Sequence, residues 1–273
     1  MSLSADLSRP SASEPPALRL SSIGKTFVTP AGLLKPAYRT VALRDISIEV
    51  QPSEILAIVG ESGSGKTTLG RIVVGLLKPD RGAAHFGERT LVDVSRGIHI
   101  PAAKRGVGMI FQDPTSSLNP RMRVRDVVGE GLRLAGVGRR EITERAAAAL
   151  NLVGLSSKDL DRYPHQFSGG QRQRIGIARA IVMEPAVLVA DEPVSSLDVS
   201  VQMQVLNLML DIRDKLKLTV LFITHNIAVV EYLCDRMVVL SRGEIVERGT
   251  TSTVIKAPQH PYTQRLLQAV PRL

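Results

Sequence analysis

The glycine-rich segment 60–68, which contains one lysine and two threonines, carries a strong chemical signal. The segment 60–67 fits the pattern G-x-x-x-x-G-K-[ST], in which glycines let consecutive backbone N–H groups turn inward around phosphate oxygens. Lys66 would reach the β- and γ-phosphates of a nucleotide, and Thr67 would place its hydroxyl on Mg²⁺. Thr68 could donate a hydrogen bond to a neighbouring phosphate oxygen. The candidate nucleotide-binding residues of this loop are Gly60, Glu61, Ser62, Gly63, Ser64, Gly65, Lys66, Thr67 and Thr68.

Two adjacent carboxylates, Asp191 and Glu192, follow the apolar run 187–190. An aspartate at the end of a strand can support a metal ion, and the carboxylate after it can polarise a water molecule. Taken alone, the pair would also fit an ordinary solvated turn. The phosphate-binding pattern upstream favours the catalytic interpretation, because a bound nucleotide would need both functions.

A Ser-Gly-Gly-Gln stretch combines a helix start with exposed backbone. Ser168 and Gln171 fit a capping box that opens a helix over 171–183, which would be a purely structural role. Gly169 and Gly170, however, leave the helix N-terminus bare, so that a phosphate could approach its N–H groups. One chain cannot easily bring both its phosphate loop and this helix start to the same γ-phosphate. The pattern therefore predicts a dimer.

Alternating strands and helices must hold these residues in place. An apolar run over 54–59 has the length of a buried strand and leads directly into the phosphate loop, and a helical pattern follows until residues 78–82 stop it. The composition over 123–155 is helical, without a strand signal. Further strand candidates alternate with helical stretches, which indicates an α/β protein with a mostly parallel sheet. These strand candidates are 186–190, 219–223 and 237–240, with a helix over 201–215.

The N-terminal part predicts a different sheet. Residues 18–27 and 41–50 mix apolar and polar side chains at strand spacing. The segment between them contains Pro30, Gly32 and Pro36, which favour an irregular connection. We therefore expect an antiparallel pair of strands before the first parallel strand.

Composition limits the class of protein. The 273-residue chain is 44% hydrophobic and 22% charged, which is typical of a protein with a sizeable core. Its one cysteine, Cys234, excludes an internal disulfide and favours a reducing compartment. Residues 1–17 are rich in Ser and Pro and lack an apolar stretch, so we expect a flexible segment and no signal peptide. No stretch approaches the roughly 18 apolar residues of a membrane span, so any membrane role must be peripheral.

The net charge of +9 suits several partners. A basic balance of this size is compatible with nucleic acid, nucleotide phosphates or an anionic membrane surface. Only 3% of the residues are aromatic, and no basic run is interleaved with them. The stacking platforms of proteins that bind single-stranded nucleic acid are therefore not visible.

In order and spacing, these residues resemble the nucleotide-binding subunits of ABC transporters across nearly the whole chain. The phosphate loop looks like the Walker A motif of that family, Asp191 and Glu192 like its Walker B aspartate and catalytic glutamate, and residues 167–171 like its signature motif, usually begun by Leu instead of Phe. The resemblance implies an α/β P-loop NTPase with a RecA-like core sheet, an N-terminal antiparallel β subdomain and an inserted helical subdomain. The ABC ATPase domain would span 18–268, with the helical subdomain at about 113–182.

Five further residues receive a role only through this resemblance. Gln112 looks like the Q-loop glutamine, which touches Mg²⁺ or the attacking water and borders the surface that faces the membrane subunits. Asp198 resembles the D-loop aspartate at the dimer interface, and His225 resembles the switch histidine that contacts the γ-phosphate. Phe27 sits where the family stacks an aromatic ring on adenine, and Tyr38 is the competing candidate. Without the resemblance, Gln112 would be a surface amide and His225 a structural histidine.

The implied mechanism is transfer of the γ-phosphoryl group of ATP to water. Glu192 would orient or deprotonate the water, while Lys66, Mg²⁺ and His225 stabilise charge on the γ-phosphate. ATP would bridge two subunits, and hydrolysis would remove the bridge. The implied Mg²⁺ ligands are Thr67, Gln112 and, through water, Asp191. The residues that would complete the site of an opposing subunit are Ser168, Gly169, Gly170, Gln171 and Asp198.

Several longer stretches resemble the peptide and nickel importer branch of the family, namely 60–63, 111–120, 163–167 and 260–264. The resemblance implies an ATPase that drives uptake of di- or oligopeptides, or of nickel or another small solute, from the cytoplasmic face of the inner membrane. Expected partners are a second, non-identical ATPase subunit, two transmembrane permease subunits and an extracytoplasmic solute-binding protein, with no nucleic acid. Because the sequence stops at Leu273 without the cysteine-bearing extension of many relatives, no iron–sulfur cluster is expected.

Other functional classes fit the sequence less well. In a soluble ABC ATPase of DNA repair or chromosome maintenance, the net positive charge would serve to bind nucleic acid. Chromosome proteins insert a long coiled coil between the two motifs, and the 125 positions between Lys66 and Asp191 leave no room for one. The mechanism of a small-molecule kinase would give no role to residues 167–171 or to His225. An exporter ATPase would differ in the membrane subunits with which it co-purifies.

Overall fold

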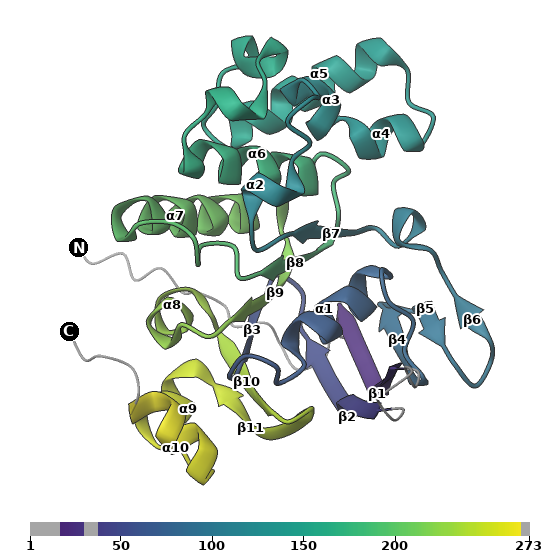
Figure 1. Ribbon diagram of the computed structural model, residues 1–273, viewed down its shortest axis with the longest axis vertical. Helices are drawn as coiled ribbons and strands as arrows, with labels where there is room; N and C mark the ends of the chain where they lie inside the picture. Colours follow the sequence, from purple (N-terminus) through teal and green to yellow (C-terminus); the bar gives the residue numbers. More distant parts are fainter. Residues whose placement is uncertain (1–16, 30–37, 269–273) are drawn as a thin grey trace, which may run out of the picture.

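Two β-sheets and a group of helices make up the part of the chain that the structure describes, which is residues 17–29 and 38–268 of a computed structural model (Figure 1). The segment 1–17, expected to be flexible, lies outside the described residues except for Ala17. The expected irregular connection with Pro30, Gly32 and Pro36 lies outside them as well, and so do residues 269–273.

The first sheet is antiparallel, with strand order β2-β1-β4-β5-β6. Its strands are β1 (Leu18–Thr29), β2 (Tyr38–Val50), β4 (Arg81–Phe86), β5 (Arg89–Asp93) and β6 (Ile98–His99). Burial alternates along the second half of β2, where Ile46, Ile48 and Val50 point into the core. The antiparallel pairing of β1 with β2 confirms the prediction. The strands β4 to β6 were not predicted, because these short segments bury few apolar side chains.

The second sheet has strand order β11-β10-β3-β9-β8-β7 and is parallel except at β11. Its strands are β3 (Ile55–Val59), β7 (Val107–Ile110), β8 (Val187–Asp191), β9 (Thr219–Thr224), β10 (Arg236–Ser241) and β11 (Glu244–Thr250). Every residue of β3, β8 and β9 is buried. Helices on both faces produce such continuous apolar strands, and the predicted, mostly parallel sheet is confirmed.

Helices cover both faces of this central sheet (Figure 1). Helix α1 packs between the two sheets, within a core formed by β1, β2, β3 and their neighbours. The opposite face packs against α6, α7 and α8 in a second core. The helices that cover the sheet are α1 (Lys66–Val74), α6 (Gly169–Ile181), α7 (Val199–Leu216) and α8 (Ile227–Leu233). Two more, α9 (Thr251–Lys256) and α10 (Pro261–Gln268), follow the last strand in sequence.

A helical lobe is inserted between β7 and β8 and forms the upper part of Figure 1. Together with α6 it contains α2 (Pro114–Ser117), α3 (Val124–Val128), α4 (Glu130–Leu134) and α5 (Arg139–Leu152). The lobe also contains two short 3₁₀ turns, η2 (Ser157–Asp161) and η3 (Pro164–Gln166). A third, η1 (Ala102–Lys104), precedes β7. The helical composition predicted from residue 123 onward corresponds to these helices. Across the described ranges, no helix is long and apolar enough to cross a membrane.

Candidate active site

The candidate site residues lie at the carboxyl ends of parallel strands. β3 leads into the phosphate loop, and β7 ends two residues before Gln112. β8 ends at Asp191, and β9 ends directly before His225. Because neighbouring parallel strands end at the same edge of a sheet, four segments far apart in sequence supply side chains to one place.

Glycine conformation shapes the phosphate loop. Gly65 is the N-cap of α1 with a φ of 109°, and a Cβ there would lie 2.5 Å from the carbonyl oxygen of Ala42. The loop therefore joins a buried strand to the N-terminus of α1, where the first backbone N–H groups have no partner within the helix. Of the other loop positions, Glu61, Ser62 and Gly63 are exposed, Ser64 is buried and Thr68 is half-buried.

Lys66 is the first residue of α1, and its ammonium group lies inside the loop. Nζ donates hydrogen bonds to the carbonyl oxygens of Gly60 at 2.7 Å and Glu61 at 2.8 Å. Only 6% of Lys66 is exposed. Burial lowers the pKa of Lys66, and nearby carboxylates, chiefly that of Glu192, oppose this effect. The loop thus holds a buried cation where phosphate oxygens of a nucleotide could receive its hydrogen bonds.

Thr67 and Asp191 meet beside this lysine. Thr67 Oγ1 donates a hydrogen bond to Asp191 Oδ1 at 3.1 Å. Burial raises the pKa of Asp191, and the hydrogen bond from Thr67 partly offsets this. The site thus presents a hydroxyl and a carboxylate side by side at the start of α1.

This oxygen pair fits the coordination of Mg²⁺. Within the described residues, no group of three or more His, Cys, Asp or Glu side chains could hold a metal ion. Mg²⁺ in nucleotide sites usually takes one or two protein oxygens and completes its shell with phosphates and water. Thr67 and Asp191 provide such oxygens, whereas the predicted third ligand, Gln112, has its amide nitrogen directed to Glu192.

Glu192 is contacted from two sides. Its Oε1 lies 3.0 Å from His225 Nδ1, and Gln112 Nε2 donates a hydrogen bond to its Oε2 at 3.4 Å. Glu192 has a φ of 48°, in the left-handed region, and its N–H donates to the carbonyl oxygen of Ile223 at 2.8 Å. Non-glycine residues seldom adopt this conformation, which clusters at functional sites. The structure therefore brings together the three side chains that follow β7, β8 and β9.

The signature residues form a helix start in the upper lobe. Ser168 Oγ accepts a hydrogen bond from the N–H of Gln171 at 3.3 Å, and Gln171 Oε1 accepts one from the N–H of Ser168 at 3.0 Å. This is the predicted capping box. A Cβ on Gly170 would collide with Val201 of α7, whereas the Cβ position on Gly169 is clear. In Figure 1, α6, which these residues begin, lies in the upper lobe, whereas α1, which follows the phosphate loop, lies below it between the two sheets.

Asp198 begins α7. Its carboxylate accepts hydrogen bonds from the N–H of Val201 at 3.0 Å and the hydroxyl of Ser200 at 2.8 Å. The bond from Val201 holds the pKa of Asp198 below its usual range. This contact is a helix cap, and the position of Asp198 at a dimer interface stays a prediction.

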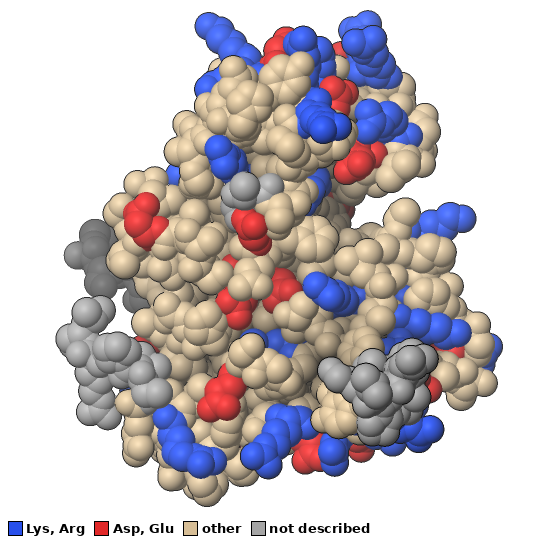
Figure 2. All heavy atoms as spheres, viewed as in Figure 1, with Lys and Arg blue, Asp and Glu red and all other residues tan. Residues whose placement is uncertain are grey.

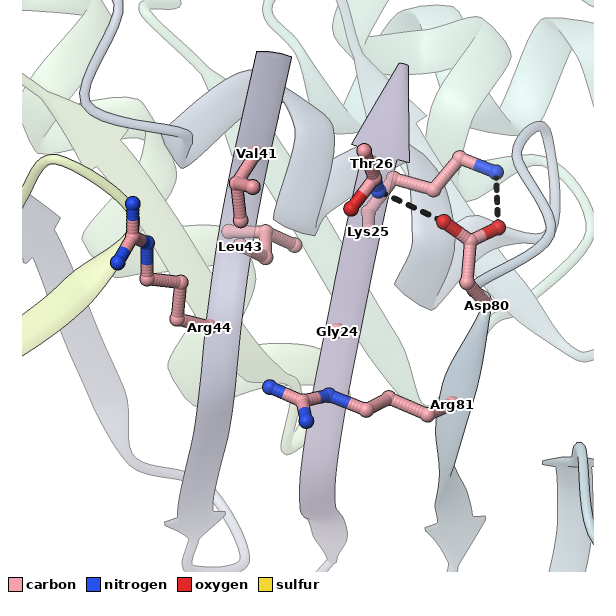
Figure 3. Close-up of a pocket in the computed structure, with 8 residues that line it drawn as sticks. All are labelled: Gly24, Lys25, Thr26, Val41, Leu43, Arg44, Asp80 and Arg81. Atoms are coloured by element: carbon pink, nitrogen blue, oxygen red, sulfur yellow. Dashed lines mark hydrogen bonds and ion pairs between the residues drawn. The ribbon is translucent and has the colours of Figure 1, made fainter. Parts of the chain in front are cut away.

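Both candidates for adenine stacking are exposed. Phe27 lies near the end of β1, and Tyr38 lies at the start of the neighbouring strand β2. The ammonium group of Lys25 lies 5.7 Å from the centre of the Phe27 ring and also donates a hydrogen bond to Asp80 at 2.8 Å. Figure 3 shows Lys25 and Thr26 directed towards Asp80 beside a pocket of about 450 Å³. The cation–π contact with Lys25 holds the ring of Phe27, and which of the two rings stacks on adenine stays a prediction.

Tyr262, beside the phosphate loop, and Arg105, at the far end of α1, carry no recognisable sequence signal. The hydroxyl of Tyr262 accepts a hydrogen bond from the N–H of Glu61 at 3.0 Å. Arg105 is fully buried and binds the last carbonyl groups of α1. Tyr262 lies in the stretch 260–264, whose family resemblance assigns it no chemistry. Contacts between such distant segments depend on the tertiary fold, so the spacing of residues along the sequence does not predict them.

Two family models match the chain. The model described as "ABC transporter" matches residues 43–195. The model described as "Oligopeptide/dipeptide transporter, C-terminal region" matches residues 246–273. Between them they cover the phosphate loop, the two carboxylates, the signature stretch and α10.

Curated proteins of two bacteria are similar over most of their length. The oligopeptide transport ATP-binding protein OppF of Streptococcus mutans is 46% identical over 86% of this chain and 77% of its own. The dipeptide transport ATP-binding protein DppF of Escherichia coli is 41% identical over 94% of this chain and 77% of its own. Both similarities extend well beyond the phosphate loop.

Solved structures share the fold. The dimeric structure of MJ0796, described as a bacterial ABC transporter cassette, superimposes with a TM-score of 0.71 at 26% sequence identity. The match covers 86% of this chain and 98% of that one. The sheets and the helical lobe are thus arranged as in an ABC cassette, which confirms the predicted fold class.

Proposed function

The chain belongs to the ATP-binding subunits of ABC transporters, and from this premise we propose that it hydrolyses ATP to drive the import of di- and oligopeptides. The observation that carries the proposal is the meeting of Lys66, Asp191 and Glu192 at one edge of the sheet. The peptide cargo is supported by the family match of the C-terminal region and by the names of both relatives. Nothing in these comparisons favours nickel over peptides.

Hydrolysis is an attack of water on the γ-phosphorus of ATP. The new P–O bond forms as the bond to the bridging oxygen breaks, and ADP leaves. Glu192 receives the proton of the water or orients it, and His225 and Gln112 hold the Glu192 carboxylate in place. Lys66 binds the phosphate oxygens from inside the loop, while bound Mg²⁺ would neutralise part of their charge. Thr67 and Asp191 would hold that ion.

The site is completed by a second subunit. Ser168 and Gly170 lie in the upper lobe, so they can face a phosphate loop only across a head-to-tail dimer. Gly169 and Gln171 would lie at the same contact, with Asp198 crossing the interface. The dimeric ABC cassette of the same fold supports this arrangement. We place the helical subdomain at about 113–182 within an ATPase domain of 18–268, and we expect the partner to be a non-identical ATPase subunit.

A groove between the two lobes fits a membrane subunit. It has a volume of about 620 Å³ and lies between α4, the end of α1 and the start of β7, where Figure 2 shows a hollow on the right. Leu76, Leu134 and Met183 are large, exposed apolar side chains on its rim. Phe111 lines the groove next to Gln112, so an apolar helix docked there would lie close to the catalytic side chains.

The remaining partners follow from the importer function. We propose two transmembrane permease subunits and an extracytoplasmic solute-binding protein, with this chain at the cytoplasmic face of the inner membrane. On the face drawn in Figure 2, basic and acidic side chains are interspersed, which does not suggest a nucleic-acid track. The absence of an iron–sulfur cluster stays a prediction.

Replacing Glu192 by glutamine tests this function. Gln keeps the size of the side chain but cannot accept a proton, so we expect phosphate release to fall at least about 100-fold while MgATP still binds. Without hydrolysis the ATP bridge persists, and light scattering should show an ATP-dependent dimer mass. The matched control is Glu231→Gln on the exposed face of α8, which should hydrolyse ATP like the wild type.

Three outcomes are informative. Sustained hydrolysis by Glu192→Gln would refute the role of Glu192. Binding of MgATP without dimerisation would refute the two-subunit site for identical chains. If the isolated wild-type chain neither hydrolyses nor dimerises, the same variants are compared after reconstitution with the unlike ATPase subunit and the permease, where the 100-fold loss is again expected.

A further inference from the structure

The C-terminal helix reaches back to the phosphate loop. α10 packs beside β11 at the end of the described chain (Figure 1). Its second residue, Tyr262, directs its hydroxyl to the loop and accepts a hydrogen bond from the N–H of Glu61 at 3.0 Å. This bond joins the region matched by the peptide-transporter C-terminal model to the nucleotide-binding loop.

The same peptide group is also bound by the catalytic lysine. The N–H of Glu61 and the carbonyl of Gly60 belong to one peptide unit, which is planar. Its carbonyl oxygen accepts the hydrogen bond from Lys66 Nζ at 2.7 Å, and its N–H donates to Tyr262. A contact that fixes one end of this unit therefore fixes the other. One peptide plane separates the tyrosine hydroxyl from the lysine ammonium group.

The tyrosine is itself held firmly. Its ring is partly buried and packs against the second core, the one that α6, α7 and α8 form with the central sheet. The turn before α10 is bound to β11, because Glu247 accepts hydrogen bonds from the N–H of Gln259 at 2.8 Å and of His260 at 3.0 Å. His260 Nδ1 in turn accepts the N–H of Tyr262 at 3.1 Å. Core packing and three hydrogen bonds thus fix where the hydroxyl lies.

Besides Tyr262, the turn after β10 supports the loop on this side, because the N–H of Gly243 donates a hydrogen bond to the carbonyl oxygen of Ser64 at 3.0 Å. Beside Tyr262 lies a hollow of about 560 Å³, lined by Glu61, Ser64, Arg242 and Arg265 among others. The buried hydroxyl of Ser64 has no hydrogen-bond partner among the described residues. Because open space borders the loop here, the first peptide of the loop has room to rotate once the tyrosine hydroxyl is removed.

We propose that Tyr262 is a positioning residue, which orients the Gly60–Glu61 peptide so that Lys66 is held where the β- and γ-phosphates bind. The proposal rests on the ATP-binding function proposed above and adds α10 to the nucleotide site. Tyr262 need not touch the nucleotide; it acts through the peptide plane. The hydroxyl of Tyr262 supports nucleotide binding through the loop, whereas its ring contributes to the packing of the fold.

Tyr262→Phe separates these two roles, because it removes the hydroxyl and keeps the ring. The matched control is Tyr232→Phe on α8. It also removes a tyrosine hydroxyl, one that donates a hydrogen bond to Asn207. For Tyr262→Phe we expect the Kd for MgATP, measured by calorimetry, to rise about 3- to 10-fold, the effect of losing one neutral hydrogen bond. KM for ATP should rise by the same factor, with kcat within about twofold, since the loop binds ground state and transition state alike. The control should leave both constants unchanged.

A purely structural role for Tyr262 predicts a different result. In that case Tyr262→Phe would lower the melting temperature and leave Kd and KM equal to those of Tyr232→Phe, which would overturn the proposal. A wild-type chain that binds no MgATP would refute the underlying ATP-binding function, and the proposal with it. Normal binding by both wild type and variant would refute the positioning role alone.

Amide hydrogen exchange gives a second readout that does not depend on the stability of the variant. In the folded wild type, the N–H of Glu61 should exchange more slowly than that of Ser62, the next residue of the same exposed loop, because Tyr262 binds only the N–H of Glu61. Equal exchange at the two positions would also overturn the proposal. In Tyr262→Phe, the protection at Glu61 should be lost.

Discussion

At the scale of single residues, two adjacent carboxylates differ because the strand ends between them. Asp191 is the last residue of β8, where burial raises its pKa and Thr67 binds it. Glu192 leaves the strand through a left-handed turn and contacts His225 and Gln112. The proposed division between metal support and water activation follows from these environments, since both side chains carry the same chemical group.

A raised pKa alone does not identify a catalytic carboxylate, because Glu54 has one outside the site. Burial raises the pKa of Glu54, although the N–H of Gln51 and the guanidinium of Arg236 oppose this. A carboxyl whose folded pKa lies above its unfolded value, about 4.3, adds stability below that pH and loses this contribution as pH rises through the folded pKa. Glu54→Gln cannot titrate. Its melting temperature minus that of the wild type should therefore increase, by about 2–4 °C from about pH 4 to about pH 7.

The matched control for Glu54 is Glu49→Gln, on the exposed face of β2. Its ion pair with Arg19 is exposed to solvent on both sides, so its contribution to stability is small. The melting-temperature difference for this control should change by less than about 1 °C over the same pH range. A flat difference for Glu54→Gln as well would show that the buried carboxyl does not penalise the folded state.

At the scale of elements, one buried arginine joins α1 to the strand that precedes Gln112. Arg105 donates hydrogen bonds to the carbonyl oxygens of Ile72 and Val73 in α1, and to that of Ile100 before β7. Burial lowers its pKa to about 10, so the side chain keeps its charge near neutral pH at the negative end of the helix dipole. Arg105→Met removes this donor, and the loss falls on the carbonyl oxygens of Val73 and Ile100, because that of Ile72 still accepts the N–H of Gly75 at 3.1 Å. The substitution should reduce the free energy of unfolding by about 2–4 kcal/mol in denaturant titrations.

The same substitution at an exposed arginine provides the control for Arg105. Arg140 lies on α5 with 93% of its side chain exposed and pairs with Glu144 four residues on. Arg140→Met should change the free energy of unfolding by less than about 0.5 kcal/mol. Equal effects of the two substitutions would mean that water replaces the guanidinium of Arg105 at the end of α1.

Sequence patterns predicted the elements whose signals are local. The continuous apolar runs of β3 and β8 and the Ser168–Gln171 capping box needed no knowledge of distant residues. The strands β4 to β6 were missed because the sheet stabilises segments that are weakly apolar by themselves: β4 pairs with β1, β5 with β4 and β6 with β5. The contacts of Arg105 and Tyr262 join segments distant in sequence, so no spacing rule could reveal them. The roles of Ser168 and Asp198 depend on a second subunit and stay predictions.

At the scale of the whole molecule, the single cysteine can report unfolding. Cys234 ends α8 and is buried in the second core, and burial raises the pKa of its thiol. Reaction with a disulfide reagent needs both access and a thiolate, so the folded chain must open before it reacts. We expect modification at about pH 8 to be at least about 100-fold slower in the folded chain than in concentrated guanidinium chloride. The absorbance of the released thiolate measures both rates.

Bound nucleotide should slow this reaction further, because a ligand of the folded state shifts the equilibrium away from every open form. With free MgATP at about 100 times its Kd, the folded state gains about 2.7 kcal/mol, which corresponds to about 100-fold slower modification if Cys234 is exposed only by global unfolding. Lys66→Ala, which cannot bind the phosphates in the same way, should lose most of this protection. If calorimetry shows MgATP binding while the rate at Cys234 stays the same, then α8 opens locally, and the nucleotide site and the region around α8 do not form one cooperative unit.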